Sequence, residues 1–302
     1  MRTLQIAALC FAAIFICSCG SVLRLNASSI RPWSQTLTEE YPSGKPIIAH
    51  YKRHGYELFY LAARHENDFG SETLNLVQEL FARFHFNVLI IEPIRFDSGE
   101  SPQWFIDRSK EGRTDKFIVG GESSLAALLA KEKNIPFFGG GLEHSDVYLG
   151  LKEHNYSDED ILAFYVVRQI PQWILERESV EGLLERKVPP FLEHYCKALK
   201  SLSCPTLTDI KRWYVSTTGR ELSAQVSSEE TAPYADGNLK TQKISSAVGA
   251  IRDRYTLALI ETMLHKYKRV AVVYGGSHYV TLKKSLDSGL GSPTFIEGNS
   301  LH

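Results

Sequence analysis

Five short apolar runs along the chain have the length and composition of β-strands. They are rich in valine, isoleucine, leucine and aromatic residues, and some run without an intervening polar position. An uninterrupted apolar run is typical of a strand that is covered on both faces, as in a parallel sheet. The expected strands are residues 57–62, 87–91, 116–119, 135–138 and 270–274.

Segments with helical periodicity separate these runs. Ser71 is a preferred N-cap residue, and apolar residues at helical spacing follow it as far as Phe84. Residues 124–133, 244–267 and 279–290 also have a helical pattern, and 244–267 is the longest of these segments. Alternation of strand and helix predicts an α/β fold with a mainly parallel sheet flanked by helices.

The pattern changes between about residues 145 and 242, where helical segments follow one another without a strong strand. Ser157 has a capping-box-like context that starts a helix, and Pro171 is expected to end it. We expect this stretch to be a helical insertion that covers the carboxyl ends of the strands. It could act as a lid over the site or form a packed structural subdomain, and the pattern does not decide between them.

A titratable residue follows each expected strand. His65, Glu92 and Glu122 follow the first three runs, Glu143 follows a run of three glycines after the fourth, and His278 follows paired glycines after the fifth. The carboxyl ends of parallel strands share one edge of a sheet, and ligands bind there in open α/β folds. We therefore expect these five side chains to line one polar crevice.

The amino terminus has the pattern of a bacterial lipoprotein signal. A basic start precedes an apolar run over residues 4–16, which is too short to span a bilayer. Ile16, Cys17, Ser18 and Cys19 then match a lipobox. We expect a signal peptide over 1–18, lipidation of Cys19 and a tether over 19–45, with an ordinary cleaved signal or an uncleaved anchor as alternatives.

Composition agrees with an exported globular protein. A hydrophobic fraction of 43% supports a sizeable core, and residues 46–302 are expected to form one α/β domain. The net charge of −1, without a basic cluster, argues against a nucleic-acid partner. Once the signal is removed and Cys19 is lipidated, Cys196 and Cys204 are the remaining thiols, and these two could form a disulfide in an oxidising periplasm.

The motifs AARHEND, VLIIEP, GGES, GGGLE, IRDRY and VYGGSH occur in this order over about residues 55–145 and 244–290. This ordered set resembles the superfamily that joins TraB and Tiki proteins, erythromycin esterases and ChaN-type haem-binding lipoproteins. Tiki-like members carry two Gly-x-x-His motifs, of which the second is intact here at His278. The first has Ala62 in place of glycine, which leaves the backbone near His65 open to question.

The resemblance implies three activities that share these residues. The Tiki-like branch implies a metal-dependent peptidase or esterase-like hydrolase, the esterase branch implies metal-free hydrolysis with a histidine base, and the ChaN branch implies haem binding. For the first, we expect His65, His278 and Glu122 to bind a divalent Mn, Co or Zn ion. An inactive envelope scaffold is a further alternative.

The remaining roles follow from the same hypothesis. Glu92 and Glu143 would supply a general base or a further ligand, in an order that the sequence leaves open. Arg252 would stabilise an oxyanion, and Asp253 would orient a histidine. We expect a lipid-anchored protein of the bacterial envelope, facing the periplasm from the outer membrane, that acts on an unidentified small molecule or peptide.

Overall fold

The computed structural model describes residues 23–40, 44–175, 179–199 and 203–297. The expected signal peptide and Cys19 lie outside these ranges, so both stay predictions. No helix within the described ranges is long and apolar enough to span a membrane.

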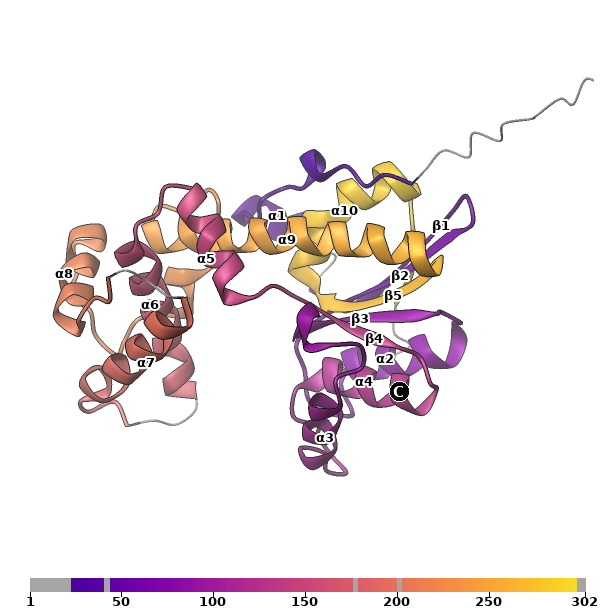
Figure 1. Ribbon diagram of the computed structural model, residues 1–302, viewed down its shortest axis with the longest axis horizontal. Helices are drawn as coiled ribbons and strands as arrows, with labels where there is room; N and C mark the ends of the chain where they lie inside the picture. The colour runs from indigo at the N-terminus through magenta and orange to yellow at the C-terminus, as the bar shows by residue number, and fades with distance from the viewer. Residues whose placement is uncertain (1–22, 41–43, 176–178, 200–202, 298–302) are drawn as a thin grey trace, which may run out of the picture.

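The described part of the chain contains a six-stranded sheet with the strand order β4-β3-β5-β2-β1-β6 (Figure 1). The four strands from β4 to β2 are parallel, whereas β1 and β6 add antiparallel pairs at one side. The predicted α/β class with a mainly parallel sheet is therefore confirmed. The strands are β1 Ile47–Arg53, β2 Tyr56–Ala63, β3 Val88–Arg95, β4 Phe137–Gly141, β5 Arg269–Gly275 and β6 Thr294–Glu297.

Two differences from the expected strands have local causes. Residues 116–119 form no strand, and only isolated antiparallel bridges connect Phe117 with Asp68 and Ile118 with Arg113. This prediction was wrong because a short apolar run also suits a loop whose Ile118 alone is buried in the core. Strand β1 was missed, although His54 and Gly55, both at positive φ, close a tight hairpin to β2.

Helices cover both faces of the sheet (Figure 1). Helices α2 (Glu72–Arg83) and α4 (Gly121–Glu132) lie on one face, with α3 (Gln103–Glu111) packed against α4. Helices α9 (Lys240–Tyr267) and α10 (Gly276–Leu290) lie on the other. In β2, alternate residues belong to the two opposite cores, which explains its continuous apolar run.

The segment expected to be a tether packs on the domain over its described part, so this prediction was wrong there. It contains η1 (Ala27–Ser29) and α1 (Gln35–Glu40). Leu23 and Leu25 are buried, and the Leu25 N–H donates to Glu261 of α9 at 2.7 Å. Gly289 of α10 permits this approach, because a Cβ there would lie 2.6 Å from the Leu25 side chain.

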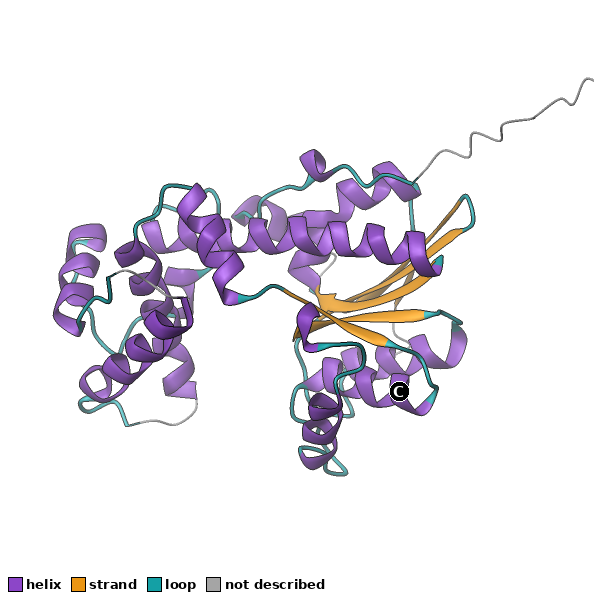
Figure 2. Ribbon diagram, in the orientation of Figure 1, coloured by secondary structure: helices purple, strands orange, loops and turns teal. Residues whose placement is uncertain are grey.

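The described residues between 144 and 231 form, with the amino-terminal half of α9, a helical body without strands that we call the helical lobe (Figure 2). Its residues pack around their own core, separate from the two cores of the sheet. This independent core fits a packed subdomain better than a loose cover. The lobe contains α5 His144–Glu153, α6 Asp158–Leu175, α7 Leu183–Leu199, α8 Leu207–Thr218 and η3 Ser228–Thr231.

Helix α6 continues through Pro171 to Leu175, so the predicted helix end was wrong. An internal proline costs about 3 kcal/mol through a lost hydrogen bond and a steric clash. Ile170 and Trp173, on either side of it, are buried in the lobe core, and their packing opposes that cost.

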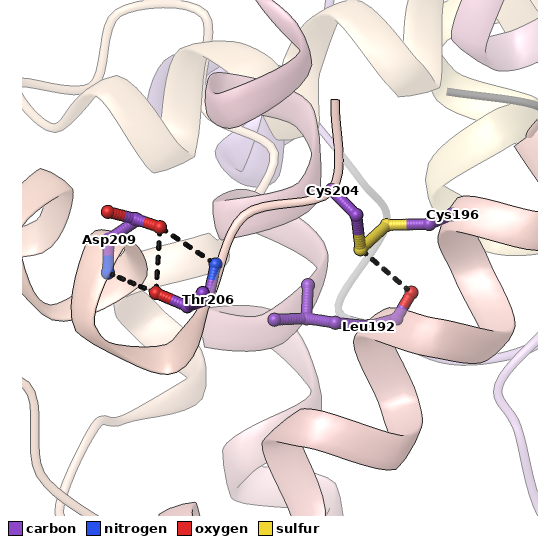
Figure 3. The surroundings of a disulfide bond; sticks show 5 residues. All are labelled: Leu192, Cys196, Cys204, Thr206 and Asp209. Carbon is purple, nitrogen blue, oxygen red and sulfur yellow. Dashed lines mark hydrogen bonds between the residues drawn. A yellow bond between two sulfur atoms is a disulfide. The ribbon is translucent and has the colours of Figure 1, made fainter. Parts of the chain in front are cut away.

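The disulfide between Cys196 and Cys204 is present in the structure (Figure 3). It links α7 to the start of α8 across a Cα–Cα distance of 5.7 Å. Thr206 and Asp209 form a capping box immediately beyond it. The bridge therefore ties the end of α7 to the residues just before α8 and lies away from the sheet edge.

Candidate functional site

The parallel register of β2, β3 and β5 sets the position of the site. Strand β5 lies between the other two, and Gly275 at its end pairs with Ala63 of β2. His65 therefore leaves the sheet beside the start of α10, which carries His278, and Glu92 leaves it from β3 on the other side of β5. This arrangement brings three of the predicted residues to one edge.

The His65 ring is held by Glu122 from the first turn of α4. His65 Nδ1 lies 2.7 Å from Glu122 Oε1. The glutamate side chain is 6% exposed and that of His65 69%, so the carboxylate is buried while the ring remains accessible. The hydrogen bond to Glu122 raises the pKa of His65 against the opposing effect of burial.

The His278 ring has a matching partner in Asp253 of α9. His278 Nδ1 and Asp253 Oδ1 are hydrogen-bonded, and their side chains are only 13% and 3% exposed. The Tyr274 ring packs edge-on against the imidazole, with 4.9 Å between ring centroids. His278 is therefore the more enclosed and the more tightly oriented of the two histidines.

Glu92 lies between the two histidine–carboxylate pairs. Its Oε1 accepts from Arg252 at 2.9 Å, and its Oε2 accepts from the Gly275 N–H at 2.7 Å. Arg252 also donates to the Tyr274 hydroxyl at 3.3 Å. Burial alone would raise the pKa of Glu92, but the charges of His278 and Arg252 and the Gly275 N–H outweigh burial and lower it.

The Nε2 atoms of both histidines lie near this glutamate. His278 Nε2 is 3.8 Å from Glu92 Oε1. A Cβ on Gly275 would lie 3.1 Å from Glu92 Oε2 and 3.3 Å from His65 Nε2, so His65 approaches the same point. Glycine at 275 therefore leaves the space in which these groups meet.

Two cavities open onto this cluster. One of about 490 Å³ is lined by His65, Glu92 and Glu122. The other, of about 240 Å³, is lined by His65, Glu92, Arg252, Asp253 and His278. His65 and Glu92 border both cavities, so a bound molecule could reach the cluster from either one.

The structure does not bring Glu143 into this cluster, and the expectation of a crevice shared by all five side chains was wrong for this residue. Glu143 pairs instead with Arg95. Strand β4 is the edge strand, two strands away from β5, and the pairing of β3 with β4 shifts register between Ile91 and Arg95. The end of β4 is therefore displaced from the ends of the central strands.

The donor set fits a metal ion poorly in this arrangement. Carboxylates on the Nδ1 atoms of His65 and His278 would suit metal-binding histidines. However, both Glu92 oxygens already accept hydrogen bonds, and Glu122 is bonded to His65. Within the described ranges no three His, Cys, Asp or Glu side chains form a group that could hold a metal. The divalent ion stays a prediction.

Haem binding also stays a prediction. Tyr60, Tyr274 and Tyr279 are the tyrosines closest in sequence to the histidine motifs, and all three are at most 1% exposed. Packing in the sheet core accounts for them. The accessible His65 is the better axial-ligand candidate in this region.

Comparison of the chain with protein-family models, curated proteins and solved structures found no match. The motif resemblance therefore stays an expectation. Sequence reasoning considered Tyr274 as a haem ligand and did not include it among the hydrolase residues, although its position directly before the paired glycines at the end of β5 was an available signal.

Proposed function

We propose that this protein is a hydrolase that uses histidine as a general base, with His65, Glu92, Arg252 and His278 in its active site. The observation that carries this proposal is the pair of histidine–carboxylate dyads whose Nε2 atoms lie close to one Glu92–Arg252 pair. Such dyads occur where an imidazole must take up a proton and be stabilised as a cation. The hydrolase class is the one expected from the motif resemblance.

His65 is the better candidate for the base that activates water. Its side chain is accessible and borders both cavities, whereas His278 is enclosed. Glu122 accepts a hydrogen bond from Nδ1–H and leaves Nε2 to accept a proton from water. Its buried negative charge then stabilises the imidazolium that forms.

Arg252 would act on the substrate oxygen, and His278 would join it as a donor when its Nε2 carries a proton. Both line the smaller cavity, and each is oriented by a buried acid, Glu92 for the arginine and Asp253 for the histidine. Donors that are fixed before the reaction stabilise a developing oxyanion better than mobile donors, because they need no reorganisation. Water attack on an ester or amide carbonyl is the reaction that these roles support.

The test is a screen of ester and peptide substrates with the full chain purified in detergent, in the presence of a chelator. We expect chelator-resistant hydrolysis that falls by about 10²- to 10⁴-fold in His65→Ala and His278→Ala. His85→Ala removes an exposed histidine outside the site and should retain full activity.

Two results would replace this proposal. Hydrolysis that is lost with chelator and restored by Mn, Co or Zn, with metal found by elemental mass spectrometry, would establish the metal-dependent alternative. A chain without hydrolase activity that gains a Soret band with haem, and loses it in His65→Ala, would establish the haem-binding alternative.

The envelope location is part of the same proposal. The lipobox ending at Cys19 supports it, since a diacylated cysteine would anchor the chain to a membrane. Metabolic labelling with a fatty acid in a bacterial host should mark the wild type and not Cys19→Ala. Equal labelling of both chains would remove the lipid anchor from the proposal.

A further inference from the structure

A cavity of about 490 Å³ lies between the helical lobe and the ends of β3 and β4. One part of its wall is apolar or aromatic and contains Leu142, Val147, Tyr165, Phe191 and Tyr195. The other part carries arginine, glutamine and histidine side chains. The two kinds of wall would suit a ligand with one apolar and one charged end.

Three arginines from different elements line this cavity: Arg95 from β3, Arg168 from α6 and Arg252 from α9. Arg95 is paired with Glu143, and Arg252 is paired with Glu92. No acid within the described ranges makes an ion pair with Arg168. The cavity wall therefore carries one positive charge that the protein itself does not neutralise.

The surroundings make this charge costly in the absence of a ligand. Burial by the cavity walls lowers the pKa of Arg168, and the positive charge of Arg252 lowers it further. The Arg168 side chain nevertheless keeps access to the solvent in the cavity. An arginine that lines a cavity, is reachable by solvent and has no acid partner is suited to an incoming anion, which its planar guanidinium can bind through two hydrogen bonds.

His144 lines the same cavity, and the neighbouring positive charges also affect its pKa. Burial lowers its pKa, and the positive charges of Arg95, His194, Arg252 and Arg168 lower it further. The ring packs against Tyr195 with 5.5 Å between centroids. A neutral His144 adds a hydrogen-bonding group to the cavity without adding a further positive charge.

The lobe cavity adjoins the proposed active site. Arg168, Val248 and Arg252 line both this cavity and the smaller cavity that contains His65, Glu92 and His278. Arg168 therefore faces a molecule bound in either cavity. This shared wall gives the arginine a place in substrate recognition.

We propose that the lobe cavity binds the anionic end of the substrate, a carboxylate or phosphate joined to an aromatic or apolar body, with Arg168 as its principal cationic contact. This proposal rests on the proposed hydrolase function, because only that function makes the bound molecule a substrate. The anion site itself is supported by the cavity and its unpaired arginine. Arg168 is a specificity residue and takes no part in proton transfer.

Isothermal titration calorimetry of the full chain in detergent tests the site directly, with phenyl phosphate and phenylacetate as anionic probes and benzyl alcohol as the neutral one. We expect the anionic probes to bind at least 10-fold more tightly than benzyl alcohol. Arg168→Ala should lose this preference, and Arg168→Lys should keep part of it. Arg254→Ala removes an exposed arginine of α9 outside both cavities and should bind like the wild type.

The binding measurements and the hydrolase screen can fail independently of each other. Binding of the anionic probes that persists in His65→Ala supports the anion site even if the wild type hydrolyses nothing. The preferred probe, phosphate or carboxylate, identifies the anionic group. Equal binding by wild type and Arg168→Ala, equal binding of benzyl alcohol, or no binding of either anionic probe to the wild type would overturn the anion site, whatever the hydrolase screen shows.

Discussion

The sheet edge and the helical lobe differ in whether their basic side chains have acid partners. At the sheet edge, His65, Arg252 and His278 are each held by a buried acid within hydrogen-bonding distance. In the lobe cavity, Arg168 has no such partner within the described ranges. Paired groups keep one orientation, as a reaction requires, whereas an unpaired charge is available to a ligand.

The largest effect on activity is expected when Glu92, which lies between the two histidine–carboxylate pairs, loses its charge. Glu92→Gln leaves Arg252 without its buried counter-charge, which should destabilise the fold by about 3 kcal/mol and reduce hydrolysis by about 10³-fold. Glu143→Gln breaks the more exposed pair with Arg95 and should cost less than about 1 kcal/mol. Urea unfolding followed by circular dichroism measures both, and equal losses would contradict the distinction between the two pairs.

Removal of the Glu122 carboxylate should change both the rate and its dependence on pH. Since His65 acts when neutral and its pKa is raised, wild-type hydrolysis should rise with pH through a midpoint above 6.5. In Glu122→Gln, this midpoint should move to lower pH, because the main cause of the raised pKa is lost. The rate at neutral pH should fall by about 10²-fold, because the ring loses the acid that orients it.

The stabilisation that the His65–Glu122 pair gives the fold should depend on pH in the opposite direction to the rate. A raised folded-state pKa stabilises the fold fully below the unfolded-state value of about 6.5, and this contribution is lost as pH rises through the folded-state pKa. The stability difference between wild type and Glu122→Gln should therefore be larger at pH 5.5 than at pH 8.5. A rate midpoint that does not move in Glu122→Gln would contradict the assignment of His65 as the base.

A smaller effect is expected from a methyl group placed where the sheet-edge groups meet. Gly275→Ala should push Glu92 and His65 apart by a few tenths of an ångström and lower kcat about 10-fold, since a misplaced catalytic group loses rate. Arg254→Ala provides the control, because it changes an exposed residue of α9 that lines none of the three cavities. Steady-state kinetics of both variants would test this, and an unchanged kcat in Gly275→Ala would show that the close approach is unimportant.

The smallest effect on catalysis is expected from opening the disulfide in the lobe. Cys204→Ser removes a bridge between residues 8 positions apart, which should cost about 2 to 3 kcal/mol in stability. The bridge lies away from the sheet edge, so kcat should change less than about 2-fold. A large loss of kcat measured alongside the thermal melt would mean that lobe order controls the active site.

Pattern along the chain was sufficient for the elements whose burial is uniform. The runs that became β2, β3 and β5 are covered on both faces, so their apolar character is continuous and visible in one sequence. The run at 116–119 has similar composition, yet of its residues only Ile118 reaches the core. Composition therefore identified candidate strands, and long-range packing decided which of them joined the sheet.

The candidate site residues also differ in whether the sequence alone could group them correctly. His65, Glu92 and His278 could be grouped from the sequence because they follow central parallel strands, whose ends share an edge. Glu143 was grouped with them by the same rule, but its strand lies at the edge of the sheet, and it pairs with Arg95 instead. Strand order is set by crossovers, and the sequence alone does not reveal it.

The sequence by itself determined the α/β class, the histidines and acids at strand ends and the two cysteines that could pair, because each depends on local pattern or on residue type. Only the tertiary structure decided which acid holds which histidine and that Arg168 stands unpaired beside Arg252. Those relations join residues far apart in the chain, so they arise only when the sheet, its covering helices and the lobe pack together.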